Sequence, residues 1–268
     1  MLKDEDIFHS RTTGGSGALL DLPRERAGWE WMSLFVRRLA AGEVYEPHSN
    51  REEIGLILLG GICDADWGKG ETQIGERANV FEGLPYALYL PAGARAKLRA
   101  ISVCEIAECR VPSTAKLEPR LITPADVSVS LRGGENASRQ IVDVMPPGFP
   151  GDRLIAVEVY TPGGNWSSYP PHKHDVEDLP RENLLEETYY YRIDPPQGFA
   201  LQRIYARDGS WDVAVVCEDG DLVLVPEGYH PVAAAAGYNC YYLNAQAGPT
   251  RAWLINEDPR HAWTKGQA

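Results

Sequence analysis

YPPHKHDVEDLPRENLLEETYYYRIDPPQGF, residues 169–199, places two histidines two positions apart, ahead of an acidic loop and a run of tyrosines. In a β-strand, residues i and i+2 point to the same face, so the imidazoles of His172 and His174 can converge on one point. Lys173, between them, would then point the other way, toward solvent. A transition-metal ion is the partner that best suits such a pair of imidazoles. The spacing therefore predicts two metal ligands from one short strand.

A carboxylate ligand is expected in the segment that follows His174. The acidic candidates there are Asp175, Glu177, Asp178, Glu182, Glu186 and Glu187. Glu187 heads the strand-like run ETYYYRI, and a ligand on a strand is held more rigidly than one on a loop. Alternation along this strand puts Glu187, Tyr189 and Tyr191 on one face. We therefore favour Glu187 over Glu186, which stays open, and expect both tyrosines to be either barrel core or part of the site.

A further candidate ligand lies in GDLVLVPEGYHPV, residues 220–232. Gly228 permits a tight turn, which can aim His230 back into a barrel. Alone, an H-x-H pair can be two surface histidines, and a P-x-G-x-H segment can be a turn with a passing histidine. In this order, and with an acid heading the strand between them, the two segments predict one metal site. Its predicted ligands are His172, His174, Glu187 and His230.

Short runs rich in β-branched and aromatic residues recur along the rest of the chain. They include IGLILLGGI, YALYLPAG, RLIAVEVYTP, FALQRIYA, WDVAVVC and NCYYLNAQA. The 26 glycines and 20 prolines are spread between these runs, and no long amphipathic helix pattern competes with them. Many short strands separated by turn signals are typical of a β-sandwich or β-barrel. The sequence therefore predicts an all-β fold.

A weak internal repeat divides the chain into two halves. The similar segments are 35–53 with 157–175, and 89–95 with 224–230. Each half has a strand, a glycine turn, a segment containing a histidine and then a P-x-G turn. Two copies give about 130 residues each, a common size for a β-barrel domain. We expect an N-terminal domain over residues 1–125 and a C-terminal domain over 126–268.

The charge of the chain limits its partners. Lys and Arg total 26 against 38 Asp and Glu, which gives a formal net charge of −12 at pH 7. A net acidic surface attracts neither nucleic acid nor an anionic membrane, so we expect neither as a partner. The opening segment MLKDEDIFHS is rich in charged residues, unlike a secretory signal. No apolar run approaches the ~20 residues of a membrane span, and the five cysteines form no CxxC pair. We expect a cytoplasmic protein with reduced thiols.

The combined motifs resemble a known family. An H-x-H pair, an acid heading a strand and then G-x5-P-x-G-x-H are similar to the metal-binding motifs of cupins. Two copies would make a bicupin, with two jelly-roll-like cupin β-barrels in tandem. The longer segments PPHKHD, LEETYYYRIDPPQGFALQRIY, VLVPEGYHPV and GYNCYYLNAQAGP are similar to the 5-deoxy-glucuronate isomerases of bacterial myo-inositol catabolism. That family is related to 4-deoxy-threo-hexosulose-uronate ketol-isomerase, and the similarity covers most of the chain.

The resemblance implies an aldose–ketose isomerase that converts 5-deoxy-D-glucuronate to 5-dehydro-2-deoxy-D-gluconate with a divalent metal ion. Zinc is the ion that the family suggests, ahead of manganese, iron or nickel, which ligand type alone does not separate. The twelve residues between His174 and Glu187 exceed the three or four usual in cupins. The isomerase family shares this extension, which supports the specific match.

The first barrel departs from the ligand pattern. It keeps His48, Glu52 and Glu53, but has Asn50 in place of the second histidine and Arg95 in place of His230. A metal cation is not expected beside an arginine, because its side chain stays charged. We therefore expect the N-terminal barrel to be a structural partner without metal.

An isomerase of this kind also needs a proton carrier and a group that binds the carboxylate of its small anionic sugar substrate. The candidate catalytic residues are Glu187, Tyr189 and Tyr242. For substrate binding the candidates are Arg203, which could bind a carboxylate with two hydrogen bonds, and Tyr191. An outward-facing surface arginine is the alternative for Arg203.

Two other functions are compatible with these residues. A cupin dioxygenase with iron could use the same ligands, because fold and ligands do not fix the chemistry. A non-catalytic carbohydrate-binding cupin would bind a sugar without converting it. Barrel edges leave strand hydrogen-bonding groups unpaired, which favours association, so we expect a homo-oligomer without a predicted number of subunits.

Overall fold

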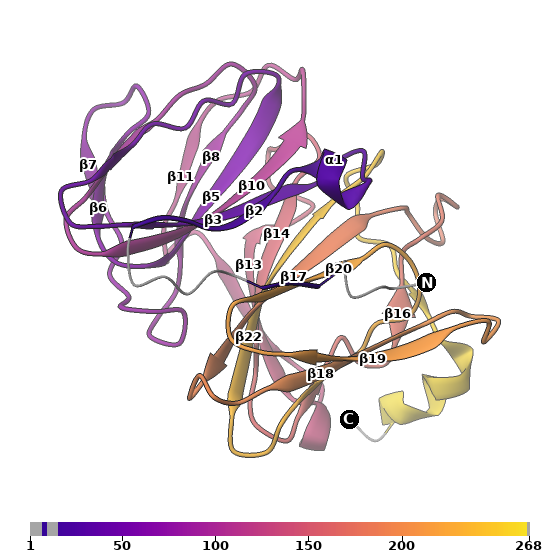
Figure 1. Cartoon of the computed structure of the whole chain (residues 1–268). Helices are drawn as coiled ribbons and strands as arrows, with labels where there is room; N and C mark the ends of the chain where they lie inside the picture. Colours follow the sequence, from indigo (N-terminus) through magenta and orange to yellow (C-terminus); the bar gives the residue numbers. More distant parts are fainter. Residues whose placement is uncertain (1–6, 10–15, 267–268) are drawn as a thin grey trace. The chain divides into compact units, whose positions relative to one another are not determined.

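Figure 1 shows a computed structural model of the chain, which describes residues 7–9 and 16–266. Nearly all of its regular structure is β-strand, which confirms the predicted all-β class. The short helical segments are α1 (Arg24–Ala27) and the 3-10 segments η2 (Glu135–Ala137) and η3 (Pro259–Gly266). None of the helices in these described ranges has the length and apolar character needed to cross a bilayer.

The chain forms two compact units, and their segments interleave in sequence. Among the described residues, the N-terminal unit contains 16–127 and 144–156, and the C-terminal unit contains 7–9, 128–143 and 157–266. This division differs from the expected single boundary between residues 125 and 126. Strand pairing is the reason, because β1 (Ile7–His9) hydrogen-bonds to a strand of the C-terminal unit.

Two antiparallel sheets form the N-terminal unit. In sheet order, the first has β11 (Arg120–Ile122), β8 (Tyr86–Leu90), β5 (Glu52–Gly60), β10 (Cys104–Pro112), β3 (Ser33–Leu39) and β2 (Gly17–Leu22). The second has β4 (Val44–Tyr45), β9 (Lys97–Ala100), β6 (Cys63–Asp66) and β7 (Thr72–Ile74). One apolar cluster contains side chains from both sheets, among them Leu56 and Leu98, and each such side chain contributes about 1.5–3 kcal/mol when buried.

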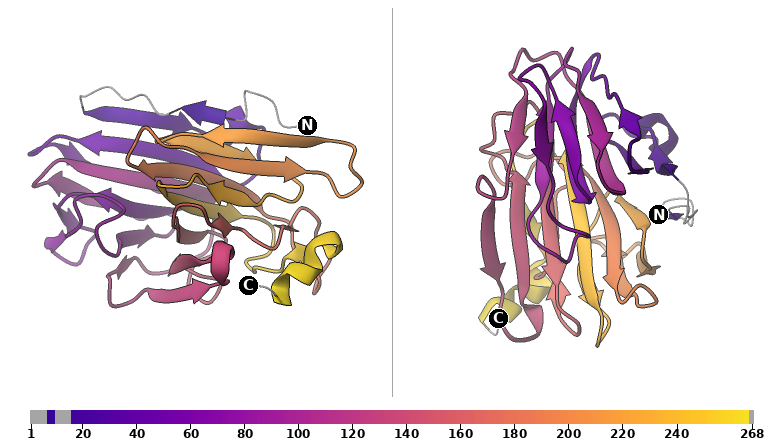
Figure 2. Two further views of the ribbon diagram at one scale, coloured as in Figure 1. Left: turned by 90° about the horizontal axis from the view of Figure 1, so that it is seen from below. Right: turned by 90° about the vertical axis from the view of Figure 1, so that its left-hand side faces the viewer.

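The C-terminal unit has a larger sheet, a smaller one and a short strand pair. In sheet order, the larger has β1, β20 (Asp221–Val225), β17 (Glu186–Asp194), β22 (Asn239–Ala247), β14 (Ile155–Thr161), β13 (Arg139–Met145) and β12 (Ser128–Arg132). The smaller has β15 (Trp166–Ser167), β21 (Val232–Ala234), β18 (Ala200–Tyr205) and β19 (Asp212–Cys217), and the pair is β16 (His172–Lys173) with β23 (Asn256–Glu257). Figure 2 shows β18 and β19 as adjacent orange strands.

The central strand β17 shows how the sequence pattern places the site. Its aromatic residues favour a strand, and alternation sends Tyr189, Tyr191 and Ile193 into the apolar core of the C-terminal unit. Glu187 lies on the same face at the start of the strand. It stands between Val225 of β20 and Gln246 of β22, so both sides of its backbone are held in the sheet.

Candidate metal centre

A buried carboxylate lies between two imidazoles at one end of the C-terminal core. The Oε2 atom of Glu187 lies 2.9 Å from Nε2 of His174 and 3.0 Å from Nε2 of His230. All three side chains are almost completely buried, and one ligand atom from each lies within 4.8 Å of the others. Three side chains from β17 and from two separate loops therefore meet at one point, and all three were predicted ligands.

Each of the three histidines has its Nδ1 atom directed at a backbone carbonyl. The accepting oxygens are those of Pro170, 3.3 Å from His172, of Leu185, 3.2 Å from His174, and of Gly228, 2.8 Å from His230. A carbonyl only accepts, so a hydrogen bond there requires the proton on Nδ1. The lone pair of a neutral imidazole is then on Nε2. This second contact is what metal-binding histidines in proteins usually have.

His172 lies beside the group of three, although its ligand atoms are not part of it. Its ring centroid is 5.1 Å from that of His230 and 6.4 Å from that of His174. Burial, and then the neighbouring His230 and His174, lower the pKa of His172 to about 3. His172 is therefore neutral at physiological pH, as a metal ligand must be. The ring of Trp253 packs against that of His172, with 6.4 Å between the two ring centroids.

The two oxygens of Glu187 have different surroundings. Gln246 donates from Nε2 to Oε1 at 2.6 Å, while Oε2 faces the imidazoles. Burial opposes ionisation of Glu187, but His174 and His230 outweigh it and hold the pKa of Glu187 well below its usual value. The same pairing outweighs the burial of His174 and raises the pKa of His174.

The buried Nε2 atom of His230 lies near Glu187 but has no partner with hydrogen-bond geometry in the described structure. Buried polar atoms without a partner are rare in folded proteins. A cation bound by imidazole nitrogens and a carboxylate oxygen would satisfy this atom and fits the borderline character of the donors. The residues present therefore fit a divalent metal ion.

The turn before His230 has the conformation expected from its glycine. Gly228 has φ +90°, and a Cβ atom there would lie 2.7 Å from the backbone oxygen of Tyr205. Its N–H also donates to Oδ2 of Asp175 at 2.8 Å. A left-handed turn in this space requires glycine, which turns His230 to face Glu187.

One of the predicted tyrosines, Tyr189, borders a histidine, and Tyr242 packs against Tyr189. The Tyr189 ring lies 5.8 Å from that of His230 and 4.9 Å from that of Tyr242. The hydroxyl of Ser168 joins the two phenols, at 3.0 Å from that of Tyr189 and 3.3 Å from that of Tyr242. Burial raises the pKa of both phenols, so they stay protonated at neutral pH.

The candidate role of Arg203 in substrate binding has to be given up. Arg203 is exposed, which agrees with the alternative of an outward-facing surface arginine, and its neighbour Gln202 is fully buried. On the outer face, Arg203 forms an ion pair with Asp212 at 2.6 Å. Ala200, the first residue of β18, faces the core. Because side chains alternate along a strand, the other even-numbered residues of β18 face the core as well. Tyr191 is buried, and its hydroxyl donates to Oε1 of Gln202 at 2.9 Å.

Lys173 is not solvated, contrary to expectation. It is 5% exposed and forms ion pairs with Asp175 and with Glu182, the latter at 2.8 Å. Glu182 also accepts the backbone N–H groups of Asp175 and Val176. Lys173 therefore fastens the acidic loop to the short strand that carries His172.

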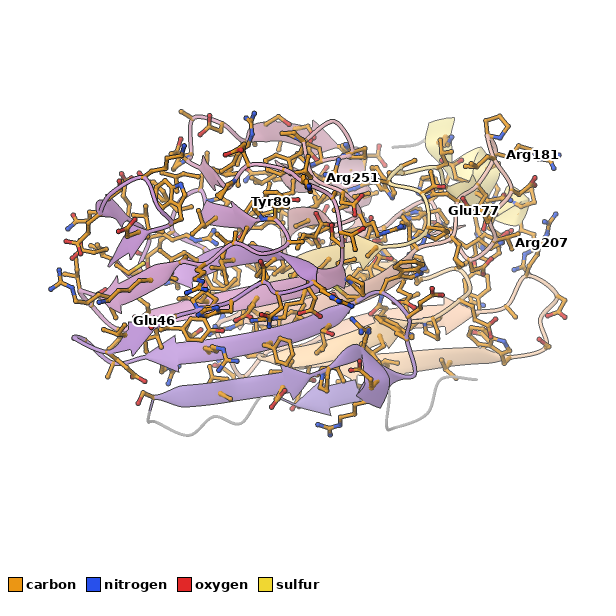
Figure 3. All side chains as sticks on the ribbon, turned by 90° about the horizontal axis from the view of Figure 1, so that it is seen from above. Glu46, Tyr89, Glu177, Arg181, Arg207 and Arg251 are labelled. Carbon is orange, nitrogen blue, oxygen red and sulfur yellow. The ribbon has the colours of Figure 1, made fainter. Side chains whose placement is uncertain are left out.

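The other acids of this loop are engaged within the C-terminal unit. Glu177, labelled in Figure 3, accepts from the hydroxyl of Thr250 at 2.6 Å and from the backbone of Leu184 at 2.9 Å. Asp178 pairs with Arg181, 2.7 Å away. The loop carboxylates thus hold the loop, and Glu187 is the acid that reaches the imidazoles.

Sequence reasoning missed Gln246, Ser168 and the burial of Gln202. Gln246 follows Tyr242 by four positions on β22, so alternation places both on one face, but nothing local distinguishes it from any other strand glutamine. Ser168 gives no sequence signal at all. Its role depends on a φ of +49° and on two tyrosines from distant strands.

The chain is similar to known proteins over nearly its whole length. Residues 7–264 match the model of the KduI/IolB family. The 5-deoxy-glucuronate isomerase of Geobacillus kaustophilus is 43% identical over 263 residues, which cover 96% of this chain and 94% of that protein. The crystal structure of an IolB-like protein from Salmonella typhimurium LT2 superimposes with a TM-score of 0.92 at 40% identity, covering 96% and 98% of the two chains.

A more distant likeness concerns the fold alone. The oxalate decarboxylase of Lactobacillus farciminis, solved as a formate complex, has a TM-score of 0.67 at 12% identity and covers 96% of this chain and 89% of its own. This likeness confirms the predicted fold, two cupin β-barrels in one chain. The family match and the full-length similarity to isomerases agree with the motifs of the C-terminal barrel. The chain belongs to the KduI/IolB family and is an isomerase.

Proposed function

We propose that the protein is a metal-dependent aldose–ketose isomerase that converts 5-deoxy-D-glucuronate to 5-dehydro-2-deoxy-D-gluconate in myo-inositol catabolism. The substrate is that of the relatives named 5-deoxy-glucuronate isomerase. The observation that carries the metal dependence is the contact of one Glu187 oxygen with Nε2 of both His174 and His230, whose Nδ1 atoms face backbone carbonyls. Such pre-oriented lone pairs are typical of a metal site.

His172, His174, Glu187 and His230 would hold the ion, for which zinc is our first choice and manganese, iron or nickel the alternatives. When bound, a divalent ion polarises a sugar carbonyl and stabilises the negative charge that develops on its oxygen. The protein supplies the orientation, because Gln246 fixes one oxygen of the carboxylate.

Moving hydrogen between C1 and C2 of the sugar also needs groups that give and take a proton. Glu187 is ionised, since its pKa is depressed, and its carboxylate can accept a proton. Tyr189 and Tyr242 are protonated and share Ser168 as a hydrogen-bond partner, so their hydroxyls can donate to sugar oxygens. Tyr191 supports these two phenols indirectly, because its hydroxyl hydrogen-bonds to Gln202.

We propose a structural role without metal for the N-terminal barrel. One of its buried carboxylates, Glu108, is paired with Arg110 and, at 3.4 Å, with Arg37. Two guanidinium groups already neutralise this carboxylate, so a further cation would be repelled. We also propose a homo-oligomer, whose subunits associate through strand edges.

The test is an assay of purified, metal-analysed protein with 5-deoxy-glucuronate. We expect the 2-deoxy-5-keto-gluconate product, its loss with chelator and its recovery on adding zinc. Oxygen uptake with the substrate would favour the dioxygenase instead. Substrate binding without conversion would replace catalysis with a binding role, and full isomerase activity in His172→Ala would refute metal catalysis with His172 as a ligand.

A further inference from the structure

Several buried polar atoms without a hydrogen-bond partner belong to side chains that face the interior of the C-terminal barrel. Within the described part of the chain they include Nε of Arg139, Oγ1 of Thr161, Nε2 of Gln202 and Nε2 of His230. Gln202 lies between Ala200 and Ile204 of the core cluster, and Arg139 shares its strand face with Ile141 of that cluster. A barrel interior with unused donors is suited to a ligand that carries many oxygen atoms.

Arg139, at the start of β13, is the cationic member of this set. Its Nη1 donates to the carbonyl of Ala137 at 2.9 Å and its Nη2 donates to that of Tyr169 at 2.8 Å. A guanidinium has five N–H groups, so others remain, including the buried Nε–H. The two carbonyls hold the side chain in place and leave donors for a second partner.

No carboxylate pairs with Arg139 among the residues that the structure describes. The charged neighbour that acts on it is Arg132, which is also a cation, and the nearby phenol of Tyr242 is protonated. Arg203 on the outer face, by contrast, has Asp212 as its partner. A half-buried guanidinium without a counterion, in a protein of net charge −12, is costly unless an anion binds to it.

The segment Ser168–Tyr169 connects Arg139 with the metal centre. Arg139 donates to the carbonyl of Tyr169, the preceding Ser168 hydrogen-bonds to both Tyr242 and Tyr189, and Tyr189 packs against His230. Ser168 has φ +49°, a strained conformation for a non-glycine residue, and such conformations cluster at ligand-binding sites. The carbonyl that Arg139 holds belongs to the next residue, Tyr169.

We propose that Arg139 binds the carboxylate of the sugar acid while the other end of the sugar lies at the metal centre. The inference rests on the proposed function, which supplies an anionic substrate, and it replaces Arg203 in the role that the sequence suggested. Arg139 then determines specificity: a sugar acid is held by charge-assisted hydrogen bonds, and a neutral sugar is not.

The experiment compares Arg139→Gln and Arg139→Lys with Arg203→Gln, which removes an arginine from the outer face of the same barrel. Each is assayed with 5-deoxy-glucuronate and with 5-deoxyglucose, in which a hydroxymethyl group replaces the carboxylate. We expect Arg139→Gln to raise KM for the acid about 30- to 100-fold, as for a lost charged hydrogen bond. Its kcat/KM for the neutral sugar should not change. Arg139→Lys should recover part of the loss, and Arg203→Gln should resemble the wild type.

A merely structural role for Arg139, holding Ala137 and Tyr169, predicts a different result. Both substrates would then lose activity equally and the melting temperature would fall, which would overturn the proposal. Calorimetric binding of glucuronate to chelator-treated protein gives a second measurement that does not depend on catalysis. Weaker binding in Arg139→Gln would support the carboxylate site even if the wild type did not isomerise 5-deoxy-glucuronate. Equal binding in both proteins, or no binding by the wild type together with an unchanged KM, would refute it.

Discussion

Two buried carboxylates, Glu187 in the C-terminal unit and Glu108 in the N-terminal unit, differ in what neutralises them. Glu187 in the C-terminal unit lies between the imidazoles of His174 and His230. Glu108 in the N-terminal unit is fully buried between the guanidinium groups of Arg37 and Arg110. Both arrangements satisfy the same physical requirement, because a buried charge is tolerated only when it is paired.

The difference teaches that the neutralising group decides what the site can do. An arginine is always charged and offers only donors, so the Glu108 network is complete as it stands. An imidazole can lose its proton and then offers a lone pair, so the Glu187 group can exchange protons for a metal ion. The surroundings of Glu108 raise the pKa of Tyr45 to about 12, chiefly through burial and then through the Glu108 charge, and this phenol also donates to Glu108.

Glu52 and Glu53, the acids of the first barrel that match the ligand pattern, bind other groups within the N-terminal unit. Glu53 is fully buried and accepts the backbone N–H groups of Asp152, Arg153 and Leu154, as well as the hydroxyl of Tyr89, labelled in Figure 3.

Glu52 pairs with Arg24 and Arg110. Arg95, expected at the position of a ligand, is exposed, and Arg37 and Arg110 neutralise the interior instead.

Among the changes that test the difference between the two barrels, removal of a metal ligand should have the largest effect. His174→Ala should abolish stoichiometric metal binding and lower kcat by about 1,000-fold or more, because metal stabilisation of the transition state amounts to several kcal/mol. Metal content by mass spectrometry and steady-state kinetics measure both. An unaltered metal content would place the ion elsewhere in the molecule.

The matched change in the other barrel should act on stability and not on metal. Arg110→Met leaves Glu108 with less compensation, and breaking a buried ion pair costs about 3 kcal/mol or more. We expect lower resistance to denaturant, with metal content and activity per folded molecule unchanged. Loss of bound metal in this variant would refute the proposed division of roles between the barrels.

The phenols near the centre should have intermediate effects. Tyr189→Phe should lower kcat about 10- to 100-fold at full metal occupancy, because it removes the hydroxyl of a ring that packs against His230. Tyr89→Phe, which removes a buried hydroxyl from the N-terminal unit, is the control and should leave kcat unaltered. Equal kcat in Tyr189→Phe and the wild type would assign Tyr189 to the core.

The most gradual effect concerns pH. The raised pKa of His174 in the metal-free protein means that a proton competes with the ion, so metal affinity should fall as pH falls below that pKa. The decrease should reach about tenfold per pH unit for each proton displaced. Zinc competition with a chelator from about pH 8 to about pH 5 measures it. A pH-independent affinity would exclude His174 as a ligand.

Local spacing was enough to predict much of the candidate site. His174, Glu187 and His230 meet as expected, because strand alternation and the left-handed turn at Gly228 act over a few residues. The all-β class follows from the short runs and turns, and the two cupin barrels follow from the resemblance of the motifs to cupins.

The errors share a physical cause. When the pairing register of a strand shifts by one residue, every side chain moves to the opposite face of the sheet. For β18 this register depends on the pairing with β19 and β21. Arg203 was therefore a candidate for substrate binding although it lies on the outer face. Lys173 was expected in solvent because its partner Glu182 approaches only when the acidic loop folds back.

By itself, the sequence determined the all-β class, the family and the residues able to form a metal site, since these depend on residue type and short-range spacing. Only the tertiary structure decided which residues support that site and where the units divide. Gln246 reaches Glu187 because two strands pair in one register, although 59 positions separate them. Arg139 reaches the carbonyl of Tyr169 for a similar reason, since contacts between distant segments depend on sheet order and register, which no local pattern specifies.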